Sequence, residues 1–175
     1  MYRQNIAVIG LFTAFNAETA RVIADEFELL FLEANKYLEW DITYSIQEII
    51  KDFGEEYFIK CEAKTYKALS EFTTSSIGAS ATALINKDNI VNLRKSSYIV
   101  MLTAGEQITK RRLSLDPENY MKEYFLRDYD NIIKKINEEI VPLCDIIINT
   151  DFMTPVKAAK RVEGELKKLI FGAEV

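Results

Sequence analysis

The sequence contains no histidine, and this absence removes several classes of chemistry at once. Ser-His and Cys-His nucleophile pairs, histidine-ligated metals and histidine acid–base catalysis are all excluded. Only two cysteines are present, Cys61 and Cys144, and they lie far apart in patterned segments. Such a pair is typical of buried thiols in a reducing compartment. We therefore predict neither a disulfide nor a metal site from these cysteines.

Basic charge and long apolar runs are also scarce. The net charge of −5 argues against a nucleic-acid partner and against an anionic membrane surface. Charged residues interrupt every long apolar stretch, so none reaches the roughly 18 residues that a membrane helix needs. We therefore expect a cytoplasmic protein, and its length favours one domain, 1–175.

Two kinds of apolar pattern alternate along the chain. Buried strands are predicted at 6–9 and 29–32, an apolar strand at 98–102, a more polar strand at 72–77 and a last strand at 144–149. Helical periodicity is found at 20–27, 46–53, 55–72, 108–113, 124–140 and 155–169. This alternation predicts an α/β domain with a parallel sheet and helices on both faces. The loops after residues 9, 32, 77 and 102 should then line a single cleft.

Local patterns predict several helix ends. Ser45 and Glu48 have the spacing of a capping box, and Gly54 follows as a helix C-cap. Asp116-Pro117 and Thr154-Pro155 each predict a helix start with proline at the first position.

Residues 5–20 have the outline of a phosphate-binding loop, in which a strand, a glycine and a loop lead into a helix. The full pattern is G-x-x-x-x-G-K-[ST], whose lysine reaches the phosphates and whose hydroxyl holds Mg²⁺. Gly10 supplies the first glycine, but Phe15 stands at the second, Asn16 at the lysine and Ala17 at the hydroxyl. The outline is therefore kept while the groups that bind phosphate and magnesium are replaced.

The order of these features resembles the shikimate kinase family of small P-loop phosphotransferases, over about residues 5–170. The resemblance rests on the strand before Gly10, the acidic strand end at Glu33, the run 45–62, the turn at Gly78 and the strand 99–102 followed by the basic run 110–112. It implies a three-layer P-loop kinase-like fold with a five-stranded parallel sheet in the order 2-3-1-4-5. It also implies ATP-dependent phosphorylation of shikimate, a step of aromatic amino acid biosynthesis.

The resemblance also places altered residues at the reacting centre. Asn16 and Ala17 match the lysine and the hydroxyl, and Glu33 and Asn35 match two aspartates, the second of which would be the general base. An amide has no titratable carboxylate and cannot serve as a base. Phe58-Ile59 matches a Phe-Arg pair whose arginine grips the substrate carboxylate, and an alkyl chain does not replace such an arginine.

Further matched positions complete two implied sites. Arg112 matches an arginine that stacks on adenine. A second substrate-binding arginine falls near Ile136, and a one-residue slip would put a cation there, since Lys134 and Lys135 are close. The implied nucleotide site, in degenerate form, is Gly10, Thr13, Asn16 and Arg112. The implied substrate site is Glu33, Asn35, Phe58, Gly78, Ala79 and Ser80, with the last three matching a Gly-Gly-Gly turn.

Because several catalytic groups are replaced together, we expect a shikimate-kinase-like protein that has lost phosphotransfer and acts as a binding or regulatory protein. This hypothesis includes no metal and no bound cofactor. An alternative is a divergent small-molecule kinase that uses Mg·ATP and takes its cation or base from Lys110, Lys134, Lys135 or Glu33.

A third alternative is a cleft that holds a ligand other than a triphosphate. Thr13, Glu33, Asn35 and Ser80 would make such a cleft polar and suited to a neutral polyol or a nucleoside. A homodimer is also open, because some of the nine tyrosines and ten phenylalanines could form an exposed patch.

Overall fold

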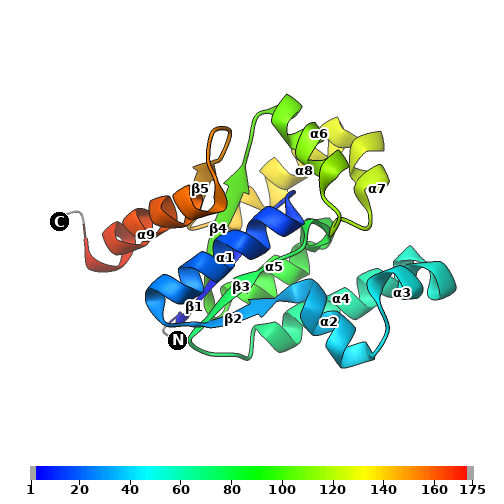
Figure 1. Ribbon diagram of the computed structural model, residues 1–175, viewed down its shortest axis with the longest axis horizontal. Coiled ribbons are helices and arrows are strands. Elements are labelled where there is room, and N and C mark those ends of the chain that lie inside the picture. The colour runs from blue at the N-terminus through cyan, green and yellow to red at the C-terminus, as the bar shows by residue number, and fades with distance from the viewer. Residues whose placement is uncertain (1–2, 173–175) are drawn as a thin grey trace.

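In the computed structural model, which describes residues 3–172, a five-stranded sheet forms the centre of the molecule (Figure 1). The strands are β1 (Asn5–Gly10), β2 (Leu30–Glu33), β3 (Ser75–Gly78), β4 (Ser97–Thr103) and β5 (Ile146–Asn149). Neighbouring strands are parallel and their order is β2-β3-β1-β4-β5. The sheet order implied by the resemblance is therefore confirmed.

Helices connect the strands and cover the sheet. They are α1 (Thr13–Phe27), α2 (Ala34–Ile42), α3 (Ile46–Phe53), α4 (Glu55–Leu69), α5 (Lys87–Arg94), α6 (Glu106–Leu115), α7 (Lys122–Arg127), α8 (Tyr129–Glu139) and α9 (Pro155–Phe171). Short 3₁₀ helices span Ala81–Ile85 and Val141–Leu143. Figure 1 shows α1 and α9 together on one side of the sheet, with α4, α5 and α8 on the other. The predicted three-layer α/β fold is confirmed.

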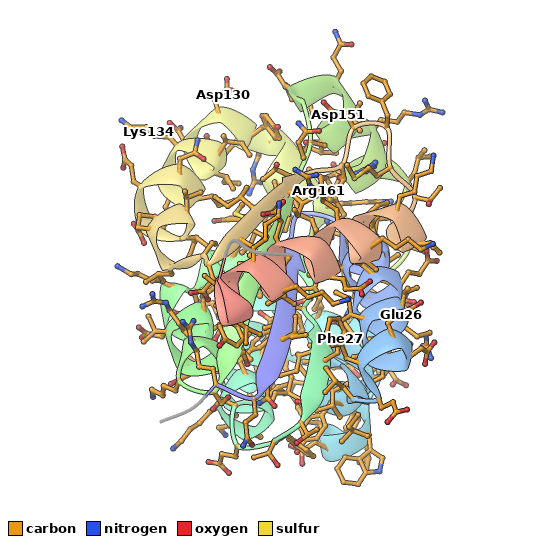
Figure 2. The ribbon with its side chains drawn as sticks, turned by 90° about the vertical axis from the view of Figure 1, so that its left-hand side faces the viewer. Glu26, Phe27, Asp130, Lys134, Asp151 and Arg161 are labelled. Atoms are coloured by element: carbon orange, nitrogen blue, oxygen red, sulfur yellow. The ribbon has the colours of Figure 1, made fainter. Side chains whose placement is uncertain are left out.

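Strand β1 lies in the middle of the sheet and is covered on both faces. Ala7 and Ile9 pack in the core beneath α4, α5 and α8, while Ile6 and Val8 pack beneath α1 and α9. Each of these four side chains is buried. Figure 2 looks onto α9, which carries Arg161 and packs beside α1. The continuous apolar run of β1 is thus explained by the two layers that enclose it.

The two outer strands of the sheet are only partly covered by helices. The run 29–32 was expected to be a buried strand, but β2 forms an edge of the sheet and Leu30 is 52% exposed. Strand β5 forms the opposite edge, and its Ile147 points outward while Ile146 and Ile148 are buried. The prediction of a buried strand is therefore wrong for 29–32, because the edge strand β2 is only partly covered along its whole length.

Most predicted helix ends are confirmed, and one is wrong. Ser45 and Glu48 form a capping box at the start of α3, Gly54 is its C-cap, and the Thr154 hydroxyl caps α9. Asp116-Pro117 begins no helix, because the chain turns there and α7 starts only at Lys122. The single helical stripe predicted for 124–140 is two helices, α7 and α8, separated at Asp128.

The structure also bears on the predictions about membrane helices and about the two cysteines. Within residues 3–172, the helices are all too short or too polar to cross a membrane. Cys61 and Cys144 are free thiols, the first buried and the second partly buried.

Candidate functional site

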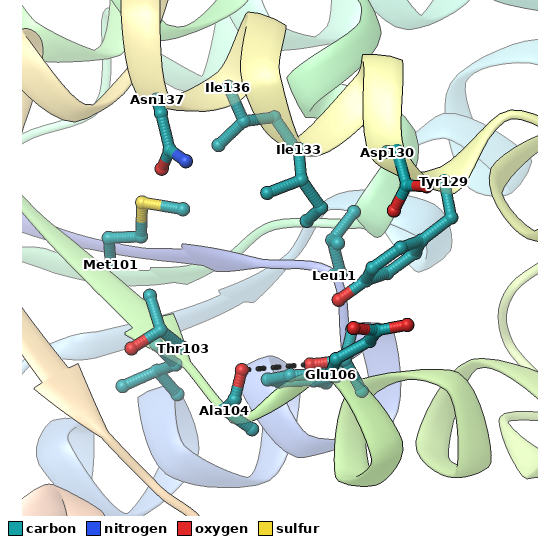
Figure 3. A pocket seen from close by; sticks show the side chains of 13 residues that line it. Leu11, Met101, Thr103, Ala104, Glu106, Tyr129, Asp130, Ile133, Ile136 and Asn137 are labelled. Atoms are coloured by element: carbon teal, nitrogen blue, oxygen red, sulfur yellow. Dashed lines mark hydrogen bonds between the residues drawn. The ribbon is translucent and has the colours of Figure 1, made fainter.

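The carboxyl ends of the strands do not open into the single cleft that the sequence predicts. The loops after β1 and β4 line one pocket, which Figure 3 shows from close by. The loop after β2 lines a separate surface hollow, with Leu32, Glu33 and Trp40. The loops after β1 and β3 pack directly on each other, since the Asn16 amide donates to the Ala79 carbonyl at 3.0 Å. The four loops are therefore divided, and the expectation of one shared cleft is wrong.

Helix α1 begins at Thr13, only three residues after Gly10. The Asn16 N–H donates to the Phe12 carbonyl at 2.7 Å, as in any helical turn. The N–H of Ala14 instead donates to the Asp116 carboxyl, 3.2 Å away and 102 residues distant in the sequence. An internal acidic side chain therefore lies at the N-terminus of the helix, where the backbone favours an anion.

Asp116 is held firmly in this position. Its side chain is 8% exposed, and its second oxygen accepts from the N–H of Glu118 at 3.0 Å. Burial raises the pKa of Asp116, and the N–H groups of Glu118, Ala14 and Thr13 oppose that shift. The sequence predicts a helix start at Asp116-Pro117. The chain instead forms a turn there, and this turn packs on the first turn of α1.

Asn16, at the position of the P-loop lysine, is fully buried and bonded to backbone. Its amide donates one hydrogen to the Gly10 carbonyl at 2.9 Å and the other to the Ala79 carbonyl. Gly10 has φ +154°, and a Cβ there would meet the Leu102 carbonyl oxygen at 2.5 Å. Asn16 and Gly10 together therefore join β1, β3 and α1 at one tight crossing.

The remaining residues of the implied nucleotide site also contact other parts of the chain. The Thr13 hydroxyl accepts from the N–H of Ala81 at 2.9 Å. The Arg112 guanidinium donates to the Thr150 hydroxyl and carbonyl at 2.6 and 2.8 Å. It also lies over two aromatic rings, 4.6 Å from the centre of Phe15 and 5.0 Å from that of Phe12. Burial lowers the pKa of Arg112, and the two rings supply cation–π contacts.

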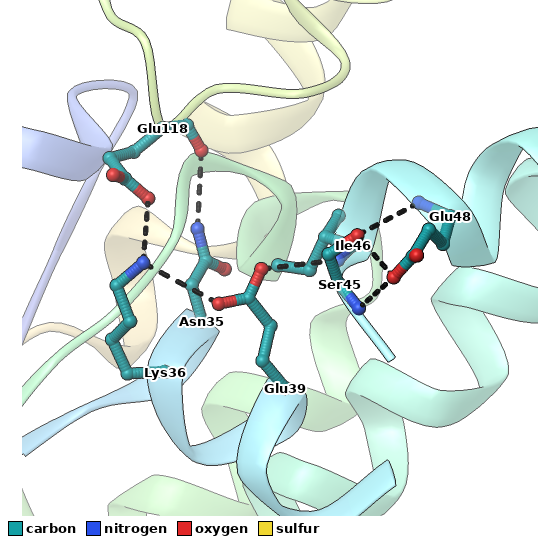
Figure 4. A network of polar contacts seen from close by, with 7 residues as sticks. All are labelled: Asn35, Lys36, Glu39, Ser45, Ile46, Glu48 and Glu118. Carbon is teal, nitrogen blue, oxygen red and sulfur yellow. Dashed lines mark hydrogen bonds and ion pairs between the residues drawn. The ribbon is translucent and has the colours of Figure 1, made fainter. Parts of the chain in front are cut away.

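Asn35 lies in the first turn of α2, in the polar network of Figure 4, and Glu33 ends β2 just before that helix. The Asn35 amide is 4% exposed and donates to the Glu118 carbonyl at 3.1 Å. Lys36 pairs with the Glu39 carboxylate at 3.4 Å and with that of Glu118 at 3.9 Å. Burial raises the pKa of Glu33. The turn at 116–118 therefore links α1 to α2 through Asp116 on one side and Glu118 on the other.

Ser80 belongs to a buried cluster between α4 and the loop after β3. Its hydroxyl donates to Glu62 Oε1 at 2.5 Å, and the Thr82 hydroxyl donates to the same oxygen at 2.5 Å. The Tyr66 hydroxyl lies 2.9 Å from the Ser80 hydroxyl and accepts from its N–H. Burial raises the pKa of Glu62 to about 7, although the hydrogen bonds from the two hydroxyls act in the opposite direction and lower it. Burial also raises the pKa of Tyr66.

The other residues of the implied substrate site are packed in the interior. Phe58 is 1% exposed and Ala79 is 1% exposed. Gly78 touches α1, since a Cβ at this position would lie 2.7 Å from the Ala17 Cα. The six residues of that site are therefore spread over a surface hollow, a helix start and the core.

Sequence reasoning missed Asp116 and Glu62 as site residues, for different reasons. Glu62 lies four residues after Phe58 and four before Tyr66, so an acidic residue on the buried stripe of α4 could have been noticed. Asp116 carries no comparable pattern, because its partner is distant in the sequence.

Comparisons with known proteins agree with this architecture. A family model described as shikimate kinase matches residues 17–163. The shikimate kinase of Caldanaerobacter subterraneus subsp. tengcongensis is 26% identical, over 79% of this chain and 94% of that protein. The shikimate kinase of Thermodesulfovibrio yellowstonii is 23% identical, over 97% of this chain and 98% of that protein.

Two solved structures have the same fold. A shikimate kinase from Aquifex aeolicus superposes with a TM-score of 0.82 at 18% identity, covering 97% of this chain and 100% of that one. A shikimate kinase from Acinetobacter baumannii, in complex with shikimate, superposes with a TM-score of 0.79 at 18% identity, covering 97% of this chain and 93% of that one.

Proposed function

The chain belongs to the shikimate kinase family, and on that premise we propose that it has lost phosphotransfer and acts as a non-catalytic binding or regulatory protein. The observation that carries the proposal is the Asp116 carboxyl on the Ala14 N–H. In a phosphate-binding loop, the N–H groups at this helix start hold the phosphate. A phosphate would have to displace Asp116 and would be repelled by its carboxylate. The chain's own side chain therefore competes with nucleotide at this position.

The residues beside Asp116 support the same proposal. The amide of Asn16 carries no charge and both its hydrogens donate to backbone carbonyls, so it cannot replace a lysine at the phosphates. Ala17 has no oxygen for Mg²⁺. Arg112, which the resemblance assigns to adenine, lies over Phe15 and Phe12 and donates to Thr150, so its guanidinium already has partners within the chain.

The expected loss of rate is large. Phosphoryl transfer depends mainly on positioning and on charge stabilisation. Removal of one preorganised donor costs about 3 kcal/mol, and three such losses lower the rate by roughly six powers of ten. The losses at the lysine, the magnesium hydroxyl and the base would not add exactly, but each has the same sign.

The alternative of a divergent kinase requires a cation that reaches the start of α1. Lys110 pairs with Glu106 at 2.7 Å and lies above the Tyr129 ring. Lys135 reaches the Ile85 carbonyl at 3.5 Å. These contacts favour the non-catalytic proposal over a kinase that uses Lys110 or Lys135.

Purified protein tests the proposal when it is incubated with shikimate and Mg·ATP in a coupled assay of ADP release. The shikimate kinase of Aquifex aeolicus serves as the active control. We expect no shikimate-dependent ADP release above the blank, and no magnesium-dependent heat when Mg·ATP is titrated in a calorimeter. Shikimate-dependent turnover would overturn the proposal.

A further inference from the structure

A pocket of about 340 Å³ lies between the carboxyl end of β4, α6 and α8 (Figure 3). Its inner wall is apolar and includes Leu11, Met101, Ile133 and Ile136. The resemblance places a substrate-binding arginine near Ile136. An apolar wall of this kind, with polar groups at one end, is typical of a small-molecule site.

The polar end of the pocket is formed by Glu106, Tyr129 and Asp130. Tyr129 is 9% exposed, and its hydroxyl forms no hydrogen bond with other residues in the described range 3–172. Figure 3 shows this hydroxyl directed into the space between α8 and Glu106. A hydroxyl at the tip of a largely buried ring that lacks a protein partner and faces a cavity is available to a ligand.

The charges at this end favour a cation. Glu106 and Asp130 are acidic, and the basic group beside them is the Lys110 ammonium, 2.7 Å from Glu106 and 4.7 Å from the centre of the Tyr129 ring. The pocket entrance thus already binds one ammonium group, through a carboxylate and an aromatic face. With two carboxylates and one ammonium, it keeps a net negative charge that disfavours phosphates and carboxylic acids.

We propose that this pocket binds a small organic amine, with its ammonium group at Tyr129 and Asp130 and its apolar body against Ile133 and Ile136. This proposal deepens the proposed function. It rests on that function in one respect, because it assumes that the amine is bound and not phosphorylated. The ligand class is opposite in charge to shikimate, which is a carboxylic acid.

Three probes of similar size test the proposal by calorimetric titration at pH 7 and low salt. They are 2-phenylethylamine, 2-phenylethanol and phenylacetate, which differ in the charge of the polar end. We expect the amine to bind about two- to fivefold more tightly than the alcohol, as for one partly exposed ion pair, and phenylacetate to bind most weakly. Tightest binding of phenylacetate, or binding of none of the probes, would overturn the proposal.

Variants show whether the binding occurs in this pocket. Asp130→Asn should weaken the amine about two- to fivefold and leave the alcohol unchanged. Glu138→Gln makes the same charge change at an exposed position of α8 outside the pocket, and it should change neither probe. Ile133→Phe should weaken all probes by filling the cavity. Unchanged amine binding in both Asp130→Asn and Ile133→Phe would refute the site.

These results are separable from the proposed function. ADP release reports phosphotransfer and does not depend on the probes. Amine binding without turnover supports both proposals, and turnover with amine binding overturns only the first. Absence of both turnover and amine binding overturns only the second.

Discussion

Glu62 gives the sharpest prediction about stability, because it is a buried carboxyl without a cationic partner among its described contacts. It is 2% exposed, its Oε1 accepts from Ser80 and Thr82, and its Oε2 has no hydrogen-bond partner within residues 3–172. Burial raises the pKa of Glu62 from the ordinary 4.5 to about 7. The folded protein therefore binds a proton at pH values where the unfolded chain has already lost it.

The sign and size of the pH dependence follow from these two pKa values. The proton on Glu62 makes its full contribution to the free energy of unfolding below about pH 4.5. This contribution is lost as the pH rises to about 7 and beyond. At about 1.4 kcal/mol for each pH unit, the gap corresponds to a loss of about 3 kcal/mol in the free energy of unfolding. Glu62→Gln keeps an oxygen for the two hydroxyls but removes the titration.

Urea unfolding between pH 4 and pH 8 measures this effect. The difference in unfolding free energy between the parent protein and Glu62→Gln should change by about 3 kcal/mol across this range. Glu56→Gln, an exposed change on the same helix, should give a curve parallel to that of the parent. The reasoning is refuted if Glu62→Gln also follows the parent curve at every pH.

Three further substitutions test individual contacts by urea unfolding at fixed pH. Asp116→Ala removes the acceptor of the Ala14 N–H and should lower the free energy of unfolding by about 1–2 kcal/mol; no loss would mean that the contact is unimportant. Gly78→Ala places a Cβ 2.7 Å from the Ala17 Cα and should cost about 1–3 kcal/mol, so unchanged stability would contradict the close approach. Ser45→Ala breaks the capping box and should cost about 1 kcal/mol; a neutral result would contradict that cap.

The central part of the fold could be predicted because its pattern depends on burial alone. The run 6–9 is apolar at each position, and the structure covers it on both faces. The run 29–32 has the same character but lies at an edge of the sheet, with Leu30 half exposed. Composition of a single run cannot distinguish the two cases, because exposure depends on which strand pairs beside it. The resemblance supplied the strand order that the runs alone did not.

The site was less predictable because its contacts join distant segments. Asp116-Pro117 has a local pattern for a helix start, yet the Asp116 carboxyl binds the first turn of α1. Tertiary contacts of this kind override local preference. Asn16 could be identified as a replaced lysine from the sequence, but its bonds to Gly10 and Ala79 depend on the packing of β3 against α1. The sequence therefore shows which catalytic groups are replaced, but it does not show which residues the replacements contact.

Access of phosphate to the start of α1 can be followed at the backbone amide of Ala14, because this N–H is the one that Asp116 binds. ¹⁵N-labelled protein is titrated with Mg·ATP, and the amide resonances of residues 13–17 are followed. Our account predicts that the Ala14 resonance keeps its position at millimolar Mg·ATP. A saturable, magnesium-dependent shift of Ala14 and its neighbours would show that the phosphates reach the start of α1, and would contradict the account.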